Sequence, residues 1–217
     1  MSTKDAFTRI YQRDTWGGGS GQGSRPEFNG EYIATLQRFL QLNDIGSVVD
    51  FGCGDWQFSR LIHWGDITYT GVDIVDSVVA ANRERHASDT VHFQLFDDLA
   101  SLPPADLILV KDVLQHLPNQ LVRDYLDHFK SKYRWLIITN DDLPQSKLNQ
   151  EINAGAWRPL RLDLPPFEEH CSTLAQWVVL TESSMNLHRK RAELLHGRGP
   201  RRPPGRPIRR SEDQNAG

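Results

Sequence analysis

The chain has 217 residues, which favours a single domain, and a net charge of −3, which argues against a general polyanion binder. Its two cysteines, Cys53 and Cys171, form no disulfide framework and are typical of a reducing cytoplasm. The first residues lack the apolar core of a secretion signal, and no apolar run approaches the ~20 residues of a membrane span, so we expect a cytoplasmic protein without membrane contact.

The first 30 residues are polar and rich in glycine, which predicts an N-terminal arm. Within it, residues 16–24 carry too many glycines to hold regular structure. Two interpretations stay open: a flexible arm, or a lid that closes over a cofactor, with Trp16 covering a ring of the ligand. Apolar residues at helical spacing then predict a helix over 31–43.

Strands and helices alternate through the middle of the chain. The pattern predicts strands over 47–53, 68–74, 91–96, 105–111, 135–139 and 174–181. It predicts helices over 57–64, 77–86 and 119–132. Near-continuous apolar strands of this kind indicate an α/β fold: a doubly wound, mostly parallel sheet with helices on both faces. We assign residues 31–186 to this domain.

The composition changes at about residue 187, where basic side chains begin to outnumber acidic ones. The basic residues are Arg189, Lys190, Arg191, Arg198, Arg201, Arg202, Arg206, Arg209 and Arg210. Repeated prolines exclude a helix near the end, so residues 187–217 are predicted to form a basic, largely disordered tail. The tail is either solvated and without function or an electrostatic contact for nucleic acid. The lack of interleaved aromatics counts against base stacking.

The most informative motif is Val48-Val-Asp-Phe-Gly-Cys-Gly54, followed by Gly71-Val-Asp73. A strand, a Gly-x-Gly turn and a second strand ending in an acid are typical of a nucleotide-like ligand, with the acid on the ribose hydroxyls. A dinucleotide would need a third glycine where Gln57 stands, and Asp50 and Asp55 would repel its pyrophosphate. The same acids can pair with the ammonium group of S-adenosylmethionine, so the charge pattern favours that cofactor.

With these motifs the chain resembles the class I S-adenosylmethionine-dependent methyltransferases, specifically a bacterial subgroup of unknown substrate. Phe96-Asp-Asp98 and Lys111-Asp-Val-Leu-Gln-His-Leu-Pro118 extend the resemblance, which covers roughly residues 45–140. It implies a Rossmann-like sheet of seven strands. One departure is Trp56, which stands where the family usually has its third glycine; a helix is still expected to begin there.

The resemblance also assigns cofactor-binding roles by position. Asp50, Gly52 and Gly54 would shape the methionine pocket, with Cys53 as a small filler in the turn. Asp73 would bind the ribose and Ile74 would pack on the adenine. Asp97 would accept a hydrogen bond from the adenine amine, with Asp98 as the second candidate. Lys111 would contribute mainly its backbone carbonyl.

Candidate catalytic residues follow the strands expected at 105–111 and 135–139, because ligands gather at the carboxyl edge of such sheets. We select His116 and Asp112. His116 is either a general base or a structural residue before the helix at 119. Asp112, Asn140 and Asp141 raise the alternative of a magnesium site like that of catechol-type methyltransferases, but their order differs from that group, and we predict no metal.

We therefore predict a methyltransferase that moves a methyl group to oxygen or nitrogen of a small molecule, for example a sugar or a natural-product intermediate. The loop residues Trp157, Arg158, Arg161 and Phe167 are candidates for the acceptor wall. Two alternatives stay open: a cofactor-binding protein without catalysis, and a nucleic-acid methyltransferase guided by the basic tail. Nucleic acid is not the expected partner, and the sequence specifies no oligomeric state.

Overall fold

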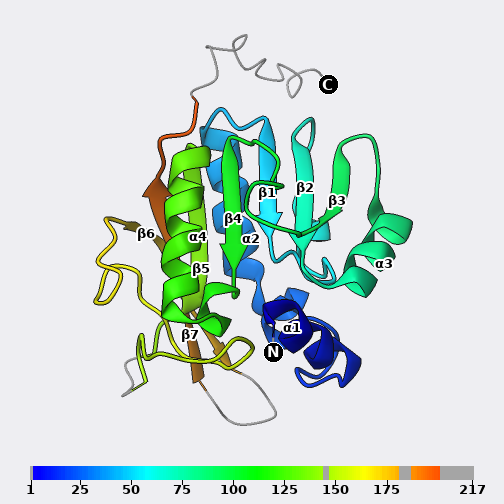
Figure 1. Cartoon of the computed structure of the whole chain (residues 1–217). Coiled ribbons are helices and arrows are strands. Elements are labelled where there is room, and N and C mark those ends of the chain that lie inside the picture. Colours follow the sequence, from blue (N-terminus) through cyan, green and yellow to red (C-terminus); the bar gives the residue numbers. More distant parts are fainter. Residues whose placement is uncertain (1, 144–146, 181–186, 201–217) are drawn as a thin grey trace.

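The computed structural model describes residues 2–143, 147–180 and 187–200, and its centre is a sheet of seven strands (Figure 1). The strand order is β3-β2-β1-β4-β5-β7-β6. Strands β1 to β5 are mutually parallel, and β7 runs antiparallel to both β5 and β6. The strands are β1 (Ser47–Phe51), β2 (Thr68–Asp73), β3 (Val91–Leu95), β4 (Leu107–Lys111), β5 (Trp135–Asp141), β6 (Ser172–Leu180) and β7 (Leu187–His196).

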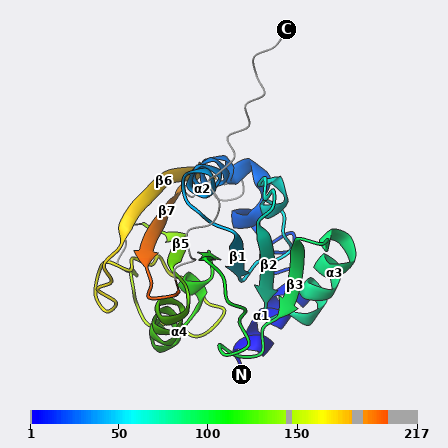
Figure 2. The same cartoon turned by 90° about the horizontal axis from the view of Figure 1, so that it is seen from above.

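Helices cover both faces of the sheet, and α2 and α4 lie on opposite sides of it (Figures 1 and 2). The α-helices are α1 (Thr3–Gln12), α2 (Gly30–Leu42), α3 (Asp76–His86) and α4 (Asn119–Lys132). Because successive strand residues point to opposite faces, the strands feed two cores. Leu107 and Leu109 of β4 pack in the core that contains α2, whereas Ile108 and Val110 pack in the core that contains α4. The predicted doubly wound, mostly parallel seven-stranded sheet is confirmed.

The predicted helix over 57–64 is wrong: this segment holds only a 3₁₀ turn, η3 (Ser59–Leu61). Trp56 leaves the glycine turn with φ of 58°, a left-handed conformation that does not begin an α-helix. Its indole is buried against Tyr69 and Phe93, with ring centroids 5.7 and 5.4 Å away. Aromatic packing under the turn therefore takes the place of the first turn of a helix.

The predicted domain boundary at 187 is also wrong, because Leu187–His196 is strand β7 and lies between β5 and β6. Three of the basic residues assigned to the tail, at 189–191, belong to this strand. Their charges are compensated inside the sheet: Arg189 and Arg191 face Asp142, and Lys190 faces Asp112. Residues 201–217 of the predicted tail lie outside the described residues.

The N-terminal arm holds more regular structure than its glycines predict. Helix α1 begins with a capping box in which Ser2 and Asp5 satisfy each other's backbone N–H groups. Two short 3₁₀ turns, η1 (Gln22–Ser24) and η2 (Pro26–Phe28), lead into α2. Figure 1 shows α1 beside the carboxyl ends of the central strands. No helix in the described part of the chain has the length and apolar character to cross a membrane.

Candidate functional site

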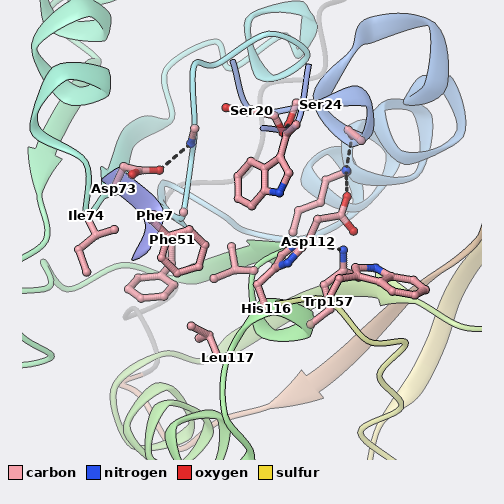
Figure 3. Close-up of a pocket in the computed structure, with 18 of the residues that line it drawn as sticks. Phe7, Ser20, Ser24, Phe51, Asp73, Ile74, Asp112, His116, Leu117 and Trp157 are labelled. Carbon is pink, nitrogen blue, oxygen red and sulfur yellow. Dashed lines mark hydrogen bonds and ion pairs between the residues drawn. The ribbon is translucent and has the colours of Figure 1, made fainter. Parts of the chain in front are cut away.

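A cavity of about 420 Å³ opens at the carboxyl edge of the parallel strands, under the N-terminal arm (Figure 3). Its walls come from the ends of β1, β2, β4 and β5, from β7, from α1 and from the arm. Of the residues predicted to bind the cofactor or to act in catalysis, eight line it: Trp16, Gly52, Gly54, Asp73, Ile74, Lys111, Asp112 and His116. This edge is where open α/β sheets bind their ligands.

The glycine turn after β1 depends on the lack of side chains at Gly52 and Gly54. Both have positive φ, 77° and 54°, and a Cβ would come within 2.3 Å of Val113 at Gly52 and within 2.2 Å of Ser20 at Gly54. The turn is tied to the end of β2, since Gly54 N donates to Asp73 Oδ2 at 3.0 Å. Val75 N donates to Asp73 Oδ1 at 3.0 Å, so two backbone groups fix this carboxylate at the cavity. Burial raises the pKa of Asp73.

Asp50 and Cys53 do not reach the cavity. The Asp50 carboxylate points into the core beneath the turn, where Tyr69 Oη donates to it at 2.6 Å and Ser59 Oγ at 3.3 Å. Burial raises the pKa of Asp50 to about 6. Burial likewise raises the pKa of the Cys53 thiol, which makes this cysteine a poor nucleophile. Both side chains are buried beneath the turn, on the side away from the cavity.

Asp97 and Asp98 follow β3 and are exposed, outside the cavity wall. Asp98 closes a local turn, in which Ser101 N donates to its Oδ1 at 2.8 Å. The preceding residue, Phe96, does line the cavity. Its ring meets Phe51 edge to face, with centroids 5.1 Å apart. The structure therefore places an aromatic ring where the sequence predicted an acid.

An apolar slot forms between the end of β2 and the segment before α4. It is lined by Phe7, Phe51, Ile74, Phe96, Leu117 and Tyr125. Figure 3 shows Phe7, Phe51 and Ile74 gathered beside Asp73. Apart from Ile74, sequence reasoning did not assign these residues to the site, because core and cavity aromatics carry the same pattern. A flat apolar ring is the group that such a slot fits.

Four alternating charges form the opposite wall of the cavity. Lys111 Nζ lies 2.6 Å from Asp112 Oδ2, Lys190 Nζ lies 2.8 Å from Asp112 Oδ1, and Lys190 Nζ also lies 2.8 Å from Asp141 Oδ1. Lys111 Nζ further donates to the Gly23 carbonyl oxygen at 2.8 Å, so its side chain holds the arm, in addition to any role of its backbone. Asp112 has φ of 58°, which turns its carboxylate between the two lysines.

This charge arrangement decides which groups can exchange protons. Burial opposes the ionised forms, but Lys111 and Lys190 hold the pKa of Asp112 below its ordinary value. Burial is likewise outweighed at Asp141, where Lys190, His188 and Trp157 lower the pKa far below the usual range. For Lys190, the two carboxylates outweigh burial and raise its pKa. Asp112 and Asp141 are therefore permanent anions and Lys190 a permanent cation near neutral pH, which makes both aspartates poor general bases.

His116 is the buried histidine of the cavity. Its Nδ1 lies 2.9 Å from the Ala156 carbonyl oxygen, which only accepts, so Nδ1 carries the proton and Nε2 keeps a lone pair. Gln115 Nε2 donates to His116 Nε2 across a long contact of 3.5 Å, a weak bond that an acceptor's O–H or N–H can replace. Burial lowers the pKa of His116. The indole of Trp16 covers the ring, with centroids 5.1 Å apart.

The arm is fastened over the glycine turn by Ser20 and Asp55. Ser20 N donates to Asp55 Oδ2 at 3.3 Å, and Asp55 N donates to Ser20 Oγ at 2.8 Å. Tyr11 Oη lies 2.7 Å from the same Ser20 hydroxyl. Asp55 thus holds the arm, which places Trp16 in the cavity wall.

Trp157 and His188 complete the wall around Asp141, and sequence reasoning missed His188 and Lys190 because it assigned β7 to the tail. Trp157 Nε1 donates to Asp141 Oδ2 at 2.8 Å, and His188 Nδ1 lies 3.5 Å from the same oxygen. Arg158, a predicted wall residue, is instead fully buried and donates to the carbonyl oxygens of Leu114 and Leu117.

Two other predicted wall residues, Arg161 and Phe167, also lie outside the cavity lining. The guanidinium of Arg161 pairs with Asp163 and Asp142.

The considered metal ligands are arranged around an ammonium group. Lys190 Nζ stands between Asp112 and Asp141, at the position a cation bridging them would take. Asn140, the third candidate, is buried and its side-chain amide has no hydrogen-bond partner among the described residues. Across residues 2–143, 147–180 and 187–200, no group of three histidine, cysteine, aspartate or glutamate side chains has the geometry to hold a metal.

Comparison with known proteins agrees with the fold and the motif. The family model described as a methyltransferase domain matches residues 25–177. No curated protein sequence matches the chain.

Solved structures similar to this one include three methyltransferases. Magnesium protoporphyrin IX methyltransferase (ChlM) from Synechocystis PCC 6803 with bound SAM is 18% identical, covers 89% of this chain and 97% of its own, and gives a TM-score of 0.60. The N-methyltransferase NodS from Bradyrhizobium japonicum WM9, in complex with S-adenosyl-L-homocysteine, is 12% identical with coverage of 88% and 98% and a TM-score of 0.62. A SAM-dependent methyltransferase from Anabaena variabilis ATCC 29413 is 14% identical with coverage of 91% and 96% and a TM-score of 0.64.

The family match spans most of the chain, the sheet has the fold of these enzymes, and the predicted cofactor is confirmed. The chain therefore belongs to the methyltransferase-domain family and is an enzyme that uses S-adenosylmethionine as its methyl donor.

Proposed function

We propose that the enzyme transfers the methyl group to an oxygen or nitrogen atom of a small molecule inside the cavity. The observation that carries this proposal is that one cavity joins Asp73 and the apolar slot to His116 and the charged wall. At about 420 Å³ it lies near the lower end of the roughly 300–1,000 Å³ typical of ligand sites. A cavity of this size, shared with the cofactor, favours a small acceptor over a nucleic acid strand.

The residues fit S-adenosylmethionine in two respects. The Asp73 carboxylate is oriented by two backbone N–H groups and can accept hydrogen bonds from both ribose hydroxyls. The slot between Ile74 and Phe96 suits the adenine ring. We assign the ring contact to Phe96 in preference to Asp97 or Asp98, which are exposed. The open backbone of Gly52 and Gly54 would face the methionine part.

When bound, the cofactor supplies a methyl group on a positively charged sulfur, which needs an aligned nucleophile and no further activation. The protein's part is to orient the acceptor and to remove its proton. His116 suits the second task because it lines the cavity and its Nε2 lone pair has only a long contact of 3.5 Å with Gln115. Trp16 and Trp157 suit the first, because their rings wall the same space.

Cofactor binding is tested with Asp73→Asn, which keeps the shape of the side chain and removes its charge. We expect the variant to bind S-adenosylhomocysteine about 10- to 100-fold more weakly in isothermal titration calorimetry, since hydrogen bonds to a charged group are worth roughly 1.5–3 kcal/mol. Asp66→Asn is the matched control, because Asp66 is exposed and lies outside the cavity wall. Equal affinities for the wild type and Asp73→Asn would contradict the assignment.

Methyl transfer is tested by incubating the enzyme and S-adenosylmethionine with a panel of small hydroxyl and amine compounds and measuring S-adenosylhomocysteine. We expect at least one acceptor to raise its formation, and His116→Gln to lower that rate by about 10²- to 10⁴-fold with cofactor binding unchanged. Tight binding of the cofactor without turnover on any acceptor would favour the non-catalytic alternative.

A further inference from the structure

Resting on the proposed function, we propose that Lys190 binds the attacking atom of the acceptor, and that this atom is the oxygen of a flat aromatic hydroxyl compound, a phenol. Lys190 has no assigned role, and it reaches the cavity from β7, a strand at the antiparallel side of the sheet. Three independent features point to this acceptor class: the N–H donor that Lys190 has left, the prior pairing of the carboxylates that an amine would need, and the rings around the site.

Lys190 has a hydrogen to spare at the cavity. An ammonium group carries three N–H donors. One makes a hydrogen bond of 2.8 Å to Asp112 Oδ1, and the contact of 2.8 Å to Asp141 Oδ1 is an ion pair of poorer hydrogen-bond angle. Within the described part of the chain these two carboxylates are its partners. The side chain is 7% exposed and lines the cavity, so the remaining donor is available to an acceptor bound there.

The carboxylates of the same wall are already paired, so the N–H groups of an amine would have to compete with those partners. Both oxygens of Asp112 face lysines. Of the Asp141 oxygens, Oδ1 faces Lys190 and Oδ2 accepts from Trp157 Nε1. His116 Nε2 is the uncharged acceptor of this wall, and it can take a single proton. One donor and one proton acceptor match a hydroxyl group, whose oxygen accepts from Lys190 while its proton goes to His116.

Aromatic side chains define the shape of this space. Trp16 lies over His116, and the ring of Trp157 meets that of His188 edge to face with centroids 6.2 Å apart. Figure 3 shows Asp112, His116 and Trp157 facing the same part of the cavity. Aromatic rings in the cavity wall favour a flat ligand by stacking and edge contacts.

The charges agree with an acceptor that becomes anionic. Lys111, Asp112, Lys190 and Asp141 sum to zero, and the cofactor adds one positive charge next to them. In the transfer, the acceptor's O–H bond breaks and its proton passes to His116 Nε2. An oxygen electron pair forms the O–CH₃ bond as the C–S bond breaks, and the electrons of that bond stay on sulfur as a neutral thioether. Lys190 donates to this oxygen while the oxygen carries negative charge. A fixed cation stabilises that charged state more than the neutral hydroxyl.

The test uses two matched flat probes, 4-nitrophenol and 4-nitroaniline, with the full-length enzyme saturated with S-adenosylhomocysteine. Absorbance of the phenolate gives the pKa of bound 4-nitrophenol. We expect the wild type to lower it by about one unit, which corresponds to tenfold tighter binding of the ionised form. We expect 4-nitroaniline to bind at least about tenfold more weakly. An unshifted probe pKa, or equal affinity for the two probes, would overturn the proposal.

Lys190→Met should abolish the shift, but it leaves two buried carboxylates with fewer counter-charges and could fail to fold. The double variant Lys190→Met with Asp141→Asn removes one charge of each sign and serves in that case. We expect it to bind S-adenosylhomocysteine like the wild type and to leave the probe pKa unshifted, and a retained shift would overturn the proposal. Lys147→Met is the control, since Lys147 is exposed and outside the cavity wall. If the wild type does not bind S-adenosylhomocysteine at all, the proposed function is rejected instead.

Discussion

His116 is the residue whose protonation should set the acid limit of the reaction. Burial lowers its pKa below the ordinary value of 6.5, so the imidazole is neutral and basic near neutral pH. As the pH falls through that lowered pKa, protonation of Nε2 removes the base. We expect long-range ¹H–¹⁵N NMR to show a proton on Nδ1 at pH 7 and a titration midpoint below 6.5, with His116→Gln assigning the signal. A midpoint above 6.5 would contradict this role.

Removing Lys190 should convert the charged wall into a cation site. In Lys190→Ala, the Asp112 and Asp141 oxygens that each lay 2.8 Å from Nζ would lose the cation between them, and Lys111 would remain paired with Asp112 alone. Hard cations prefer such oxygen ligands. The indole of Trp157, which is hydrogen-bonded to Asp141, can sensitise the luminescence of a terbium ion bound there. We expect Tb³⁺ emission to be several-fold stronger than in the wild type.

The control for this experiment is Lys190→Ala with Asp141→Asn, in which one of the two facing carboxylates is gone. Its emission should return to about the wild-type intensity. Emission from Lys190→Ala no stronger than that of the wild type would show that the two carboxylates do not form a site.

At the level of single residues, sequence reasoning succeeded where a position's geometry is local. Gly52, Gly54 and Asp73 belong to a turn whose shape is set within a few residues, and all three line the cavity. It could not separate the two faces of β1 and its turn, so Asp50 was expected at the ligand although its side chain is hydrogen-bonded in the core. Lys190 needs the register of β7 against β5 to reach Asp112, and no local pattern encodes that register.

At the scale of elements, residues 13–24 of the N-terminal arm should move when the cofactor enters. Hydrogen bonds at Ser20, from Gln57 to the Gly18 carbonyl oxygen and from Lys111 to that of Gly23 hold it, each worth roughly 1 kcal/mol. Local opening is therefore inexpensive, and a ligand enclosed beneath the arm will favour the closed form. We expect saturating S-adenosylhomocysteine to slow amide hydrogen exchange over 13–24 by at least about tenfold, while exchange in α3 stays unchanged.

Asp55→Ala provides the matched perturbation of the arm, because it removes the carboxylate that accepts from Ser20 N. Without ligand, exchange over 13–24 should be faster in this variant than in the wild type. If saturating ligand leaves exchange of the wild-type arm unchanged, the arm does not close over the cofactor.

Strand β7 shows why one element escaped prediction while its neighbours did not. The parallel strands are apolar on both faces and could be read directly, whereas β7 contains a run of three basic residues. Those charges are tolerated because acids on other elements neutralise them: Asp142 for Arg189 and Arg191, and Asp112 and Asp141 for Lys190. Composition alone made the same residues look like a solvated tail, since the compensating acids lie 47 or more positions away in the sequence.

For the whole molecule, the position of β7 predicts where the chain can be shortened. β7 pairs with β5 along seven residues and with β6 along its length, so it joins β6 to the rest of the sheet. A chain ending at residue 186 would expose the edge of β5 and leave Asp112 and Asp141 without Lys190. We expect it to lose its cooperative thermal transition, while a chain ending at Pro200 keeps a Tm within about 2 °C of the full length.

The chain ending at Pro200 also decides between the small-molecule reading and the nucleic-acid alternative, because it removes the remaining predicted tail without touching β7. If the tail guided a nucleic-acid substrate, full-length protein would bind a fluorescent DNA duplex with a steeper dependence on salt than the shortened chain, since each neutralised phosphate adds about 0.9 to the slope. We expect equal slopes and unchanged turnover, because the cavity, its arm and its charged wall all lie within residues 3–190. A loss of turnover in the shortened chain, with its Tm retained, would instead assign the tail a part in binding the acceptor.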